Sequence, residues 1–134
     1  MQKPIIHTCG HSNKPIAVFI KLLKDNDIEL LVDVRSIPSS RFCSQFNKSA
    51  LYATLSLHSI KYLWKGQNLG GKGINVNYEE AINELIALAK QDVRIAVMCS
   101  EKDYHKCHRY TVLTPSFEAE GVSVIHLEYE KKII

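Results

Sequence analysis

The sequence lacks any apolar run near the roughly 20 residues that a membrane-spanning helix requires. Its N-terminal stretch, MQKPIIHTCG, also lacks the apolar core of a signal peptide, so we expect a cytoplasmic protein with no membrane partner. The 4 cysteines do not form the dense pattern of a disulfide scaffold, and we expect free thiols. Internal repeats and low-complexity tracts are absent as well. These absences leave the class of ordinary globular proteins.

The chain has an average globular composition, with 46% hydrophobic and 23% charged residues among its 134 residues. A chain of this length can bury most of its apolar surface without disulfides or metals, and we expect a single domain that covers residues 1–134. The formal net charge is +3. This small excess is compatible with an anionic partner but does not require one.

Short apolar runs, each followed by turn-forming residues, predict β-strands at Pro4–Cys9, Ile28–Val34, Ile60–Trp64, Ile95–Met98 and Val122–Leu127. Apolar residues at helical spacing separate these runs. They predict a first helix that begins at Pro15 and a second that covers Ala50–Leu57. Alternating strands and helices predict a three-layer α/β/α sandwich around a mostly parallel sheet of about five strands. The spacing does not determine the strand order.

Two further helices are expected in the second half of the chain. Asn77 and Glu80 have the spacing of a capping box at the start of the third helix. The fourth helix is expected over Tyr104–Glu120, where Pro115 must bend or break the last turns. The third helix also has a regular apolar stripe, formed by Ile82, Leu85, Ile86 and Ala89.

Reactive side chains gather where the predicted strands end. These positions hold His11, Arg35 with Arg41, the glycine loop Lys65–Lys72, Cys99 with Glu101, and His126. Because all strands of a parallel sheet end at one edge, we expect these residues to meet at one site. Loops are polar in any protein, but the loops around Asp25–Asp27 and Gln91–Asp92, which are expected at the opposite edge, hold neither Cys, His nor Arg.

The stretch from Cys99 to Arg109 is the densest in reactive groups. Cys99 ends a strand before a helix, where a thiolate can be stabilised for nucleophilic attack, although a small buried thiol would fit there equally well. Glu101 could act as a general base or a nucleophile, or it could instead stabilise the helix start or pair with an arginine. Arg109 could bind an anion, but too many residues separate it from Cys99 to form the tight anion-binding loop of thiol-dependent phosphatases.

Other residues offer anion binding with a structural alternative beside it. Arg35 could hold an anion, or it could form a buried pair with Asp33. The glycine loop could approach a phosphate through its backbone, or it could form a flexible lid. It matches neither the Walker pattern nor the dinucleotide fingerprint.

A zinc site would need ligands from Cys99, Cys107, His108 and either His11 or His7. The usual ligand pairs about two to four residues apart are missing, so we expect no metal. A redox pair of Cys99 with Cys107 stays open as an alternative. No motif identifies a cofactor.

Several short motifs resemble one known family. They are TCGHS at residues 8–12, LVDVRSIPSSR at 31–41, LGG at 69–71, MCSE at 98–101 and CHR at 107–109, with Gly121 and His126 behind them. Their order over residues 5–127 is similar to that in the family called domain of unknown function 488. The resemblance implies a compact α/β domain whose matched polar residues form an active site, but it implies no particular reaction.

The resemblance carries over to residues within those motifs, namely Gly10, His11, Ser12, Asp33, Arg35, Pro38, Arg41, Gly70, Gly71, Cys99, Glu101, Cys107, His108 and Arg109.

Together these observations predict an enzyme, a hydrolase or a transferase, that acts on an anionic substrate such as a nucleotide or nucleic acid. We expect the catalytic residues to be Cys99, Glu101 and His11. Substrate binding is assigned to Arg35, Arg41, Arg109, Ser12, Gly70 and Gly71. The alternatives are a nucleic-acid-binding module without catalysis, or a Cys/His metal or thiol redox site.

Overall fold

The predicted apolar runs form one parallel sheet of 5 strands in the structure, which is a computed structural model. Residues 3–39, 41–70, 75–100 and 112–129 are described by it. The strands lie in the order β3-β2-β4-β1-β5, and every neighbouring pair is parallel. Their bounds are β1 Ile5–Gly10, β2 Leu30–Asp33, β3 Lys61–Trp64, β4 Ile95–Cys99 and β5 Ser123–His126.

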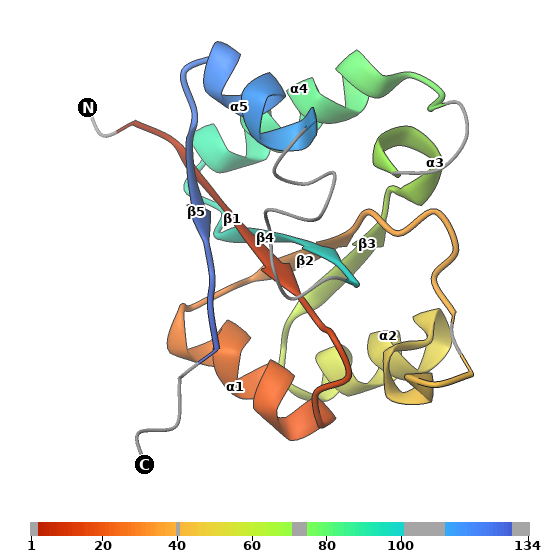
Figure 1. The fold of residues 1–134 in the computed structure, drawn as a ribbon. Helices are drawn as coiled ribbons and strands as arrows, with labels where there is room; N and C mark the ends of the chain where they lie inside the picture. Colours follow the sequence, from red (N-terminus) through yellow and green to blue (C-terminus); the bar gives the residue numbers. More distant parts are fainter. Residues whose placement is uncertain (1–2, 40, 71–74, 101–111, 130–134) are drawn as a thin grey trace.

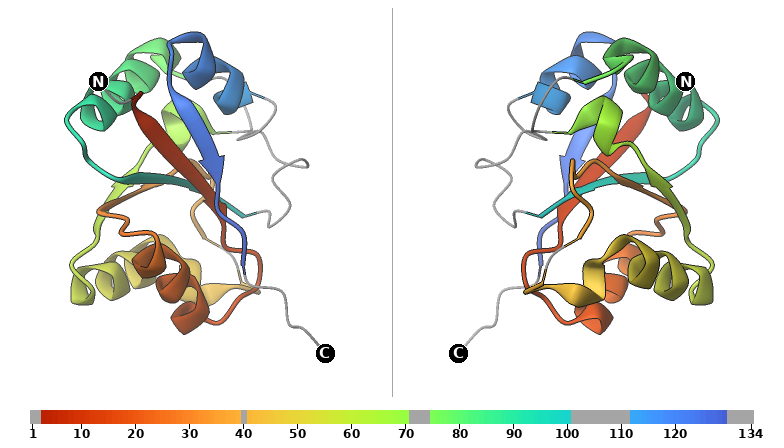
Figure 2. Two further views of the ribbon diagram at one scale, coloured as in Figure 1. Left: turned by 90° about the vertical axis from the view of Figure 1, so that its left-hand side faces the viewer. Right: turned by 90° about the vertical axis from the view of Figure 1, so that its right-hand side faces the viewer.

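Helices cover both faces of the sheet, as Figures 1 and 2 show. One face carries α1 (Ile16–Asp25), the 3-10 helix η1 (Ser44–Phe46) and α2 (Lys48–Leu57). The other face carries α3 (Gly66–Leu69), α4 (Tyr78–Lys90) and α5 (Thr114–Ala119). The predicted three-layer α/β/α sandwich with a parallel sheet is therefore confirmed. No described helix is long and apolar enough to cross a membrane.

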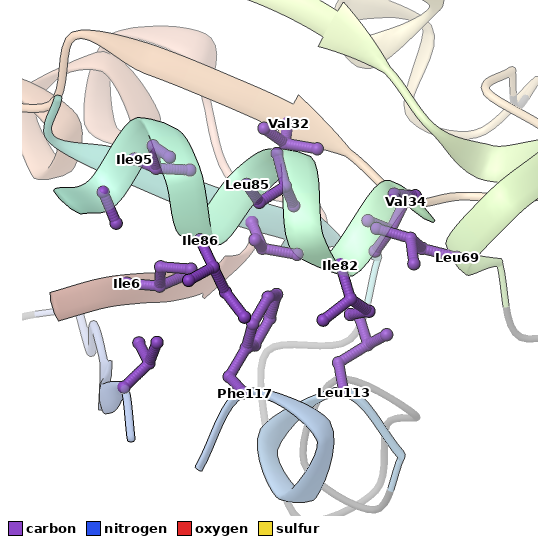
Figure 3. Packing of buried hydrophobic residues seen from close by; sticks show 14 of the residues in the cluster. Ile6, Val32, Val34, Leu69, Ile82, Leu85, Ile86, Ile95, Leu113 and Phe117 are labelled. Atoms are coloured by element: carbon purple, nitrogen blue, oxygen red, sulfur yellow. The ribbon is translucent and has the colours of Figure 1, made fainter. Parts of the chain in front are cut away.

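The sheet separates two apolar clusters because successive side chains of a strand point to opposite faces. In β1, Ile6 joins the cluster beneath α4 and α5, whereas Cys9 joins the cluster beneath α1. Figure 3 shows Leu85 and Phe117 packed into the first of these clusters. Burial of each such side chain stabilises the fold by roughly 1.5–3 kcal/mol. The predicted apolar stripe of α4 is buried, and it belongs to the cluster on this face of the sheet through Ile82, Leu85, Ile86 and Ala89.

The glycine loop differs from its prediction in its first half. Residues Gly66–Leu69 form the short helix α3 rather than a flexible loop. A side chain at Gly66 would place its Cβ atom 2.0 Å from the carbonyl oxygen of Arg35. The absence of a side chain at Gly66 thus lets α3 pack directly on the backbone after β2.

The starts of α4 and α5 bear on two further predictions. Asn77 precedes α4, but its side chain makes no capping hydrogen bond, because its backbone adopts the left-handed conformation with φ of 52°. Pro115 lies in the first turn of α5, where its missing N–H costs no helical hydrogen bond. The prediction that Pro115 bends or breaks a helix over Tyr104–Glu120 stays a prediction. The predicted residues 104–111 of that helix lie outside the described residues.

Candidate functional site at the carboxyl edge of the sheet

The carboxyl ends of β1, β4 and β2 lie next to one another in the middle of the sheet. The backbone N–H of His11 donates to the Cys99 carbonyl at 3.0 Å, and that of Ser12 donates to the Ser100 carbonyl at 2.7 Å. The Val34 N–H donates to the Met98 carbonyl at 3.0 Å. The chain leaves β1 and β2 toward the α1 and α2 face, whereas the next described helix after β4 lies on the opposite face. Ligands of open α/β sheets bind at such a reversal.

Asp33 and Arg35 form a buried ion pair at the end of β2, with 0% and 6% of each residue exposed. Arg35 donates from Nε to Oδ1 at 2.9 Å and from Nη2 to Oδ2 at 2.7 Å. Asp33 also accepts the Arg35 backbone N–H at 3.0 Å and the Tyr62 hydroxyl at 2.6 Å. A buried charge is tolerated when it is paired and hydrogen-bonded, so this carboxylate is well satisfied. The alternative that Asp33 and Arg35 pair with each other is what the structure shows.

Aromatic residues complete what we call the Arg35 network, which consists of His11, Asp33, Arg35, Phe46, Tyr62 and Trp64. Arg35 Nη2 donates to the Phe46 carbonyl at 2.7 Å, and Trp64 Nε1 donates to the Arg35 carbonyl at 2.8 Å. Burial, followed by the hydrogen bond to Asp33, raises the pKa of Tyr62. Tyr62 therefore keeps its proton and serves as a donor. The network holds the Arg35 guanidinium and backbone in a single orientation.

His11 is 3% exposed and lies between Arg35 and the ring of Phe46. Its ring stacks on Phe46 with 4.3 Å between the centroids and 17° between the planes. Burial is the main cause that lowers the pKa of His11 to about 4, with a smaller contribution from Arg35, while its contact with the Ser12 carbonyl opposes the change. The imidazole is therefore neutral at pH 7.

The tautomer of His11 follows from its two contacts. Nδ1 faces the Ser12 carbonyl, which can only accept, so Nδ1 carries the proton. Nε2 then presents a lone pair to Arg35 Nη1, 3.4 Å away. These contacts suit a residue that positions Arg35. The predicted catalytic role of His11 itself stays a prediction.

Cys99 is 4% exposed and belongs to the apolar cluster on the α4 and α5 face, together with Val97 and Leu113. Buried cysteines in apolar surroundings are usually unreactive. Ser100, the next residue, is exposed. Cys9 is buried on the opposite face, and the half-buried Cys43 contacts the Asn13 side chain with Sγ to Oδ1 at 3.4 Å.

Three more predicted positions lie on loops at this edge. Ser12 is half-buried and has a positive φ of 48°. Gly70 is buried, and a Cβ atom there would lie 2.2 Å from Ser36 Oγ, so the glycine segment packs closely on the loop after β2. Arg41 is exposed in that same loop. At the end of β5, His126 Nδ1 lies 2.6 Å from Thr8 Oγ1.

Several predicted residues lie outside the described residues, namely Glu101, Arg109, Gly71, Cys107 and His108. Among the described residues, no group of three or more His, Cys, Asp or Glu side chains could hold a metal ion.

The sequence prediction missed Phe46, Tyr62 and Trp64. Tyr62 and Trp64 alternate along β3, which is the signal for two side chains on one face of a strand. Their importance depends on β3 lying beside β2, where Trp64 pairs with Asp33 in the register of the two strands. Phe46 reaches the site through η1, and no spacing in the sequence indicates this contact.

Fold and site together define a three-layer α/β domain with a buried arginine network at the switch point of a parallel sheet. The family model described as Domain of unknown function DUF488 matches residues 15–77 and 74–114. The chain belongs to this family, as the motifs predicted. A search of curated proteins and a search of solved structures both found no match.

Proposed function

We propose that the protein is an enzyme, a hydrolase or a transferase, that acts on a phosphate-bearing substrate at the carboxyl edge of the sheet. The observation that carries this proposal is the adjacency of β1, β4 and β2, which brings His11, Arg35 and the Cys99–Ser100 segment together. A preorganised cationic group at a switch point suits the recognition of an anion. Arg41 and Arg109 are proposed to bind the same anion from the flanking loops.

The backbone at this edge adds to the proposed anion site. The backbone N–H groups of Ser12 and Gly70 already donate to the carbonyls of Ser100 and Gly66. Ser12 is therefore proposed to contact the substrate through its hydroxyl, and Gly70 and Gly71 are proposed to let the chain approach the substrate closely. Asp33 offsets the charge of Arg35, which allows this cation to be kept at a buried position beside the proposed anion site.

Cys99 and Glu101 are the two candidates for the reactive group. Cys99 is 4% exposed and is therefore poorly accessible to a substrate, and for this reason we favour Glu101. A carboxylate at that position can serve as a general base for water or for another acceptor of the transferred group.

Thiol labelling at pH 7 separates these candidates. A covalent role for Cys99 requires alkylation much faster than that of the half-buried Cys43. A role for Glu101 instead predicts slow labelling of Cys99 and near-normal turnover by Cys99→Ser. Fast labelling of Cys99 together with an inactive Cys99→Ser variant would refute the preference for Glu101.

The enzyme proposal is tested by incubating the protein with nucleotides and short oligonucleotides and following products by chromatography. Glu101→Gln should lower turnover by about 100-fold or more, the usual contribution of a general acid or base. Arg41→Ala should raise KM with a smaller effect on kcat. Lys90→Ala, which changes an exposed residue at the end of α4, is the matched charge control. Turnover that is absent throughout, or equal in all variants, would rule out the proposal.

A further inference from the structure

An open groove lies between the start of α2, the edge strand β3 and the loop after β2. Its volume is about 820 Å³, within the range of roughly 300–1,000 Å³ that is typical of ligand sites. α2 packs beside β3 in the fold (Figure 1). The groove is lined by Pro38, Ser39, Asn47, Lys48, Ser49, Tyr52, Tyr62, Leu63 and Trp64. We call it the aromatic groove.

Aromatic rings from two elements face this groove. Tyr62 and Trp64 alternate along β3, and Tyr52 comes from α2 with 58% of its surface exposed. The rings of Tyr52 and Tyr62 are 6.3 Å apart between centroids and stand edge to face at 87°. Tyr52 is exposed, whereas Tyr62 and Trp64 are half-buried in the wall of the groove. Aromatic rings that line an open groove offer stacking surfaces, and every nucleobase has a flat face that can use them.

The groove lies in the basic part of the chain. Residues 34–78 contain no Asp or Glu and carry six basic residues, Arg35, Arg41, Lys48, Lys61, Lys65 and Lys72. This segment thus has a formal charge of +6, and the rest of the chain has −3, which gives the total of +3. The modest net charge therefore conceals a strong asymmetry, which suits a polyanionic partner.

Lys48 places a positive charge next to an aromatic ring within the groove. It is exposed at the start of α2, and its Nζ lies 4.4 Å from the centroid of the Trp64 ring. A flexible lysine at this place can move from the ring to the phosphate of a nucleotide whose base stacks nearby. Lys61 is exposed on β3. Lys65 pairs with Glu84 at 2.8 Å and therefore contributes less positive charge for binding a phosphate.

Two rings of the groove, Tyr62 and Trp64, also belong to the Arg35 network. The Tyr62 hydroxyl donates to Asp33 at 2.6 Å, and Trp64 Nε1 donates to the Arg35 carbonyl at 2.8 Å. A base in the aromatic groove would therefore lie next to the residues that fix Arg35. The loop after β2 borders the groove at Pro38 and Ser39, and the exposed Arg41 follows in the same loop.

We propose that the aromatic groove binds single-stranded nucleic acid, with bases stacked on its rings and phosphates held by Lys48 and the neighbouring basic residues. A duplex keeps its bases stacked on each other, so only a single strand can present them to these rings. The inference deepens the proposed function and rests on it only for the further statement that the bound strand is also the substrate.

The chain has a single tryptophan, Trp64, so tryptophan fluorescence reports on this groove directly. The test titrates the full chain with a single-stranded oligonucleotide of about ten nucleotides, near the usual site size. Quenching should saturate, and affinity should fall steeply between about 50 and 200 mM salt. Equal affinity for a duplex of the same length, for a mononucleotide or for tripolyphosphate would overturn the proposal, as would the absence of binding at low salt.

Variants locate the binding, measured by the anisotropy of a labelled oligonucleotide. Tyr52→Ala should weaken binding by about 5-fold or more, the usual loss for one stacked base. Lys48→Ala should reduce the slope of log affinity against log salt by about 0.7, the value for one phosphate contact of a single strand. Lys90→Ala on the opposite face should change neither. Binding that is equally strong in all three variants would overturn the assignment to this groove.

The same titration with Glu101→Gln separates the two proposals. Retained binding with lost turnover supports both. Retained binding by a protein that turns over neither nucleotides nor oligonucleotides refutes the proposed function and leaves the groove supported. Turnover of nucleotides without oligonucleotide binding refutes the groove and leaves the enzyme supported.

Discussion

Acidification should destabilise the protein through His11. The pKa of this residue is lowered from 6.5 to about 4 in the folded chain, mainly by burial. Between these two values the unfolded chain binds a proton at His11 and the folded chain does not, so the free energy of unfolding falls as the pH falls. With these values, His11 lowers the free energy of unfolding by about 2 kcal/mol between pH 7 and pH 5 and by about 3 kcal/mol at pH 4.

The assay is urea unfolding at pH 7, 6 and 5, followed by the fluorescence of Trp64. His11→Gln removes the titrating group and should be less stable than wild type at pH 7, because stacking on Phe46 is lost. By pH 5 this difference should shrink by about 2 kcal/mol, since only the wild type has lost the contribution of His11. Phe19→Leu in the neighbouring core serves as control and should destabilise equally at each pH.

A difference between wild type and His11→Gln that stays constant from pH 7 to pH 5 would refute the reasoning, because it would mean that His11 has the same pKa in the folded and unfolded chains.

His7 should also lower the free energy of unfolding as the pH falls. It is 5% exposed, its pKa is lowered by burial and then by Arg94, and its Nδ1 has no hydrogen-bond partner among the described residues. His7→Gln therefore measures a second, independent part of the acid sensitivity.

Three further variants test the Arg35 network by urea unfolding at pH 7. Asp33→Asn leaves the buried guanidinium of Arg35 without its counterion and should cost about 3–5 kcal/mol, so a loss below about 1 kcal/mol would contradict a desolvated pair. Tyr62→Phe removes a hydrogen bond to a buried carboxylate and should cost about 1.5–3 kcal/mol, whereas an unchanged stability would indicate that Asp33 is satisfied without it. Gly66→Ala would place a methyl group 2.0 Å from the Arg35 carbonyl oxygen and 2.4 Å from Trp64 Nε1, and should cost about 1–3 kcal/mol; wild-type stability would refute this close packing.

Much of the architecture was predictable because each element has a local signal. Runs such as Ile95–Cys99 are apolar throughout, which identifies a strand buried on both faces, and the stripe of α4 identifies a helix packed on one side. Errors occurred where tertiary contacts replace local rules. The helix at Gly66 forms on the backbone of Arg35, and Asn77 enters α4 without capping it.

The candidate site was predictable only in part. Its members could be named, because polar residues that follow apolar strands are conspicuous in any sequence. Whether Arg35 pairs with Asp33, and whether Cys99 is open or buried, depend on neighbours from other strands. The absence of acidic residues from residues 34–78 is visible in the sequence. Only the structure shows that this basic segment lines the aromatic groove.

The sequence by itself determined the alternation of strands and helices, the family and the residues at each strand end, because these follow from local hydrophobic patterns and short motifs. The tertiary structure alone decided that β4 lies between β1 and β2, and this order places His11 against Arg35. Pairing between strands depends on contacts between distant residues. Such contacts decide which polar groups are desolvated, and desolvation sets the neutral state of His11 and the buried pair of Asp33 with Arg35.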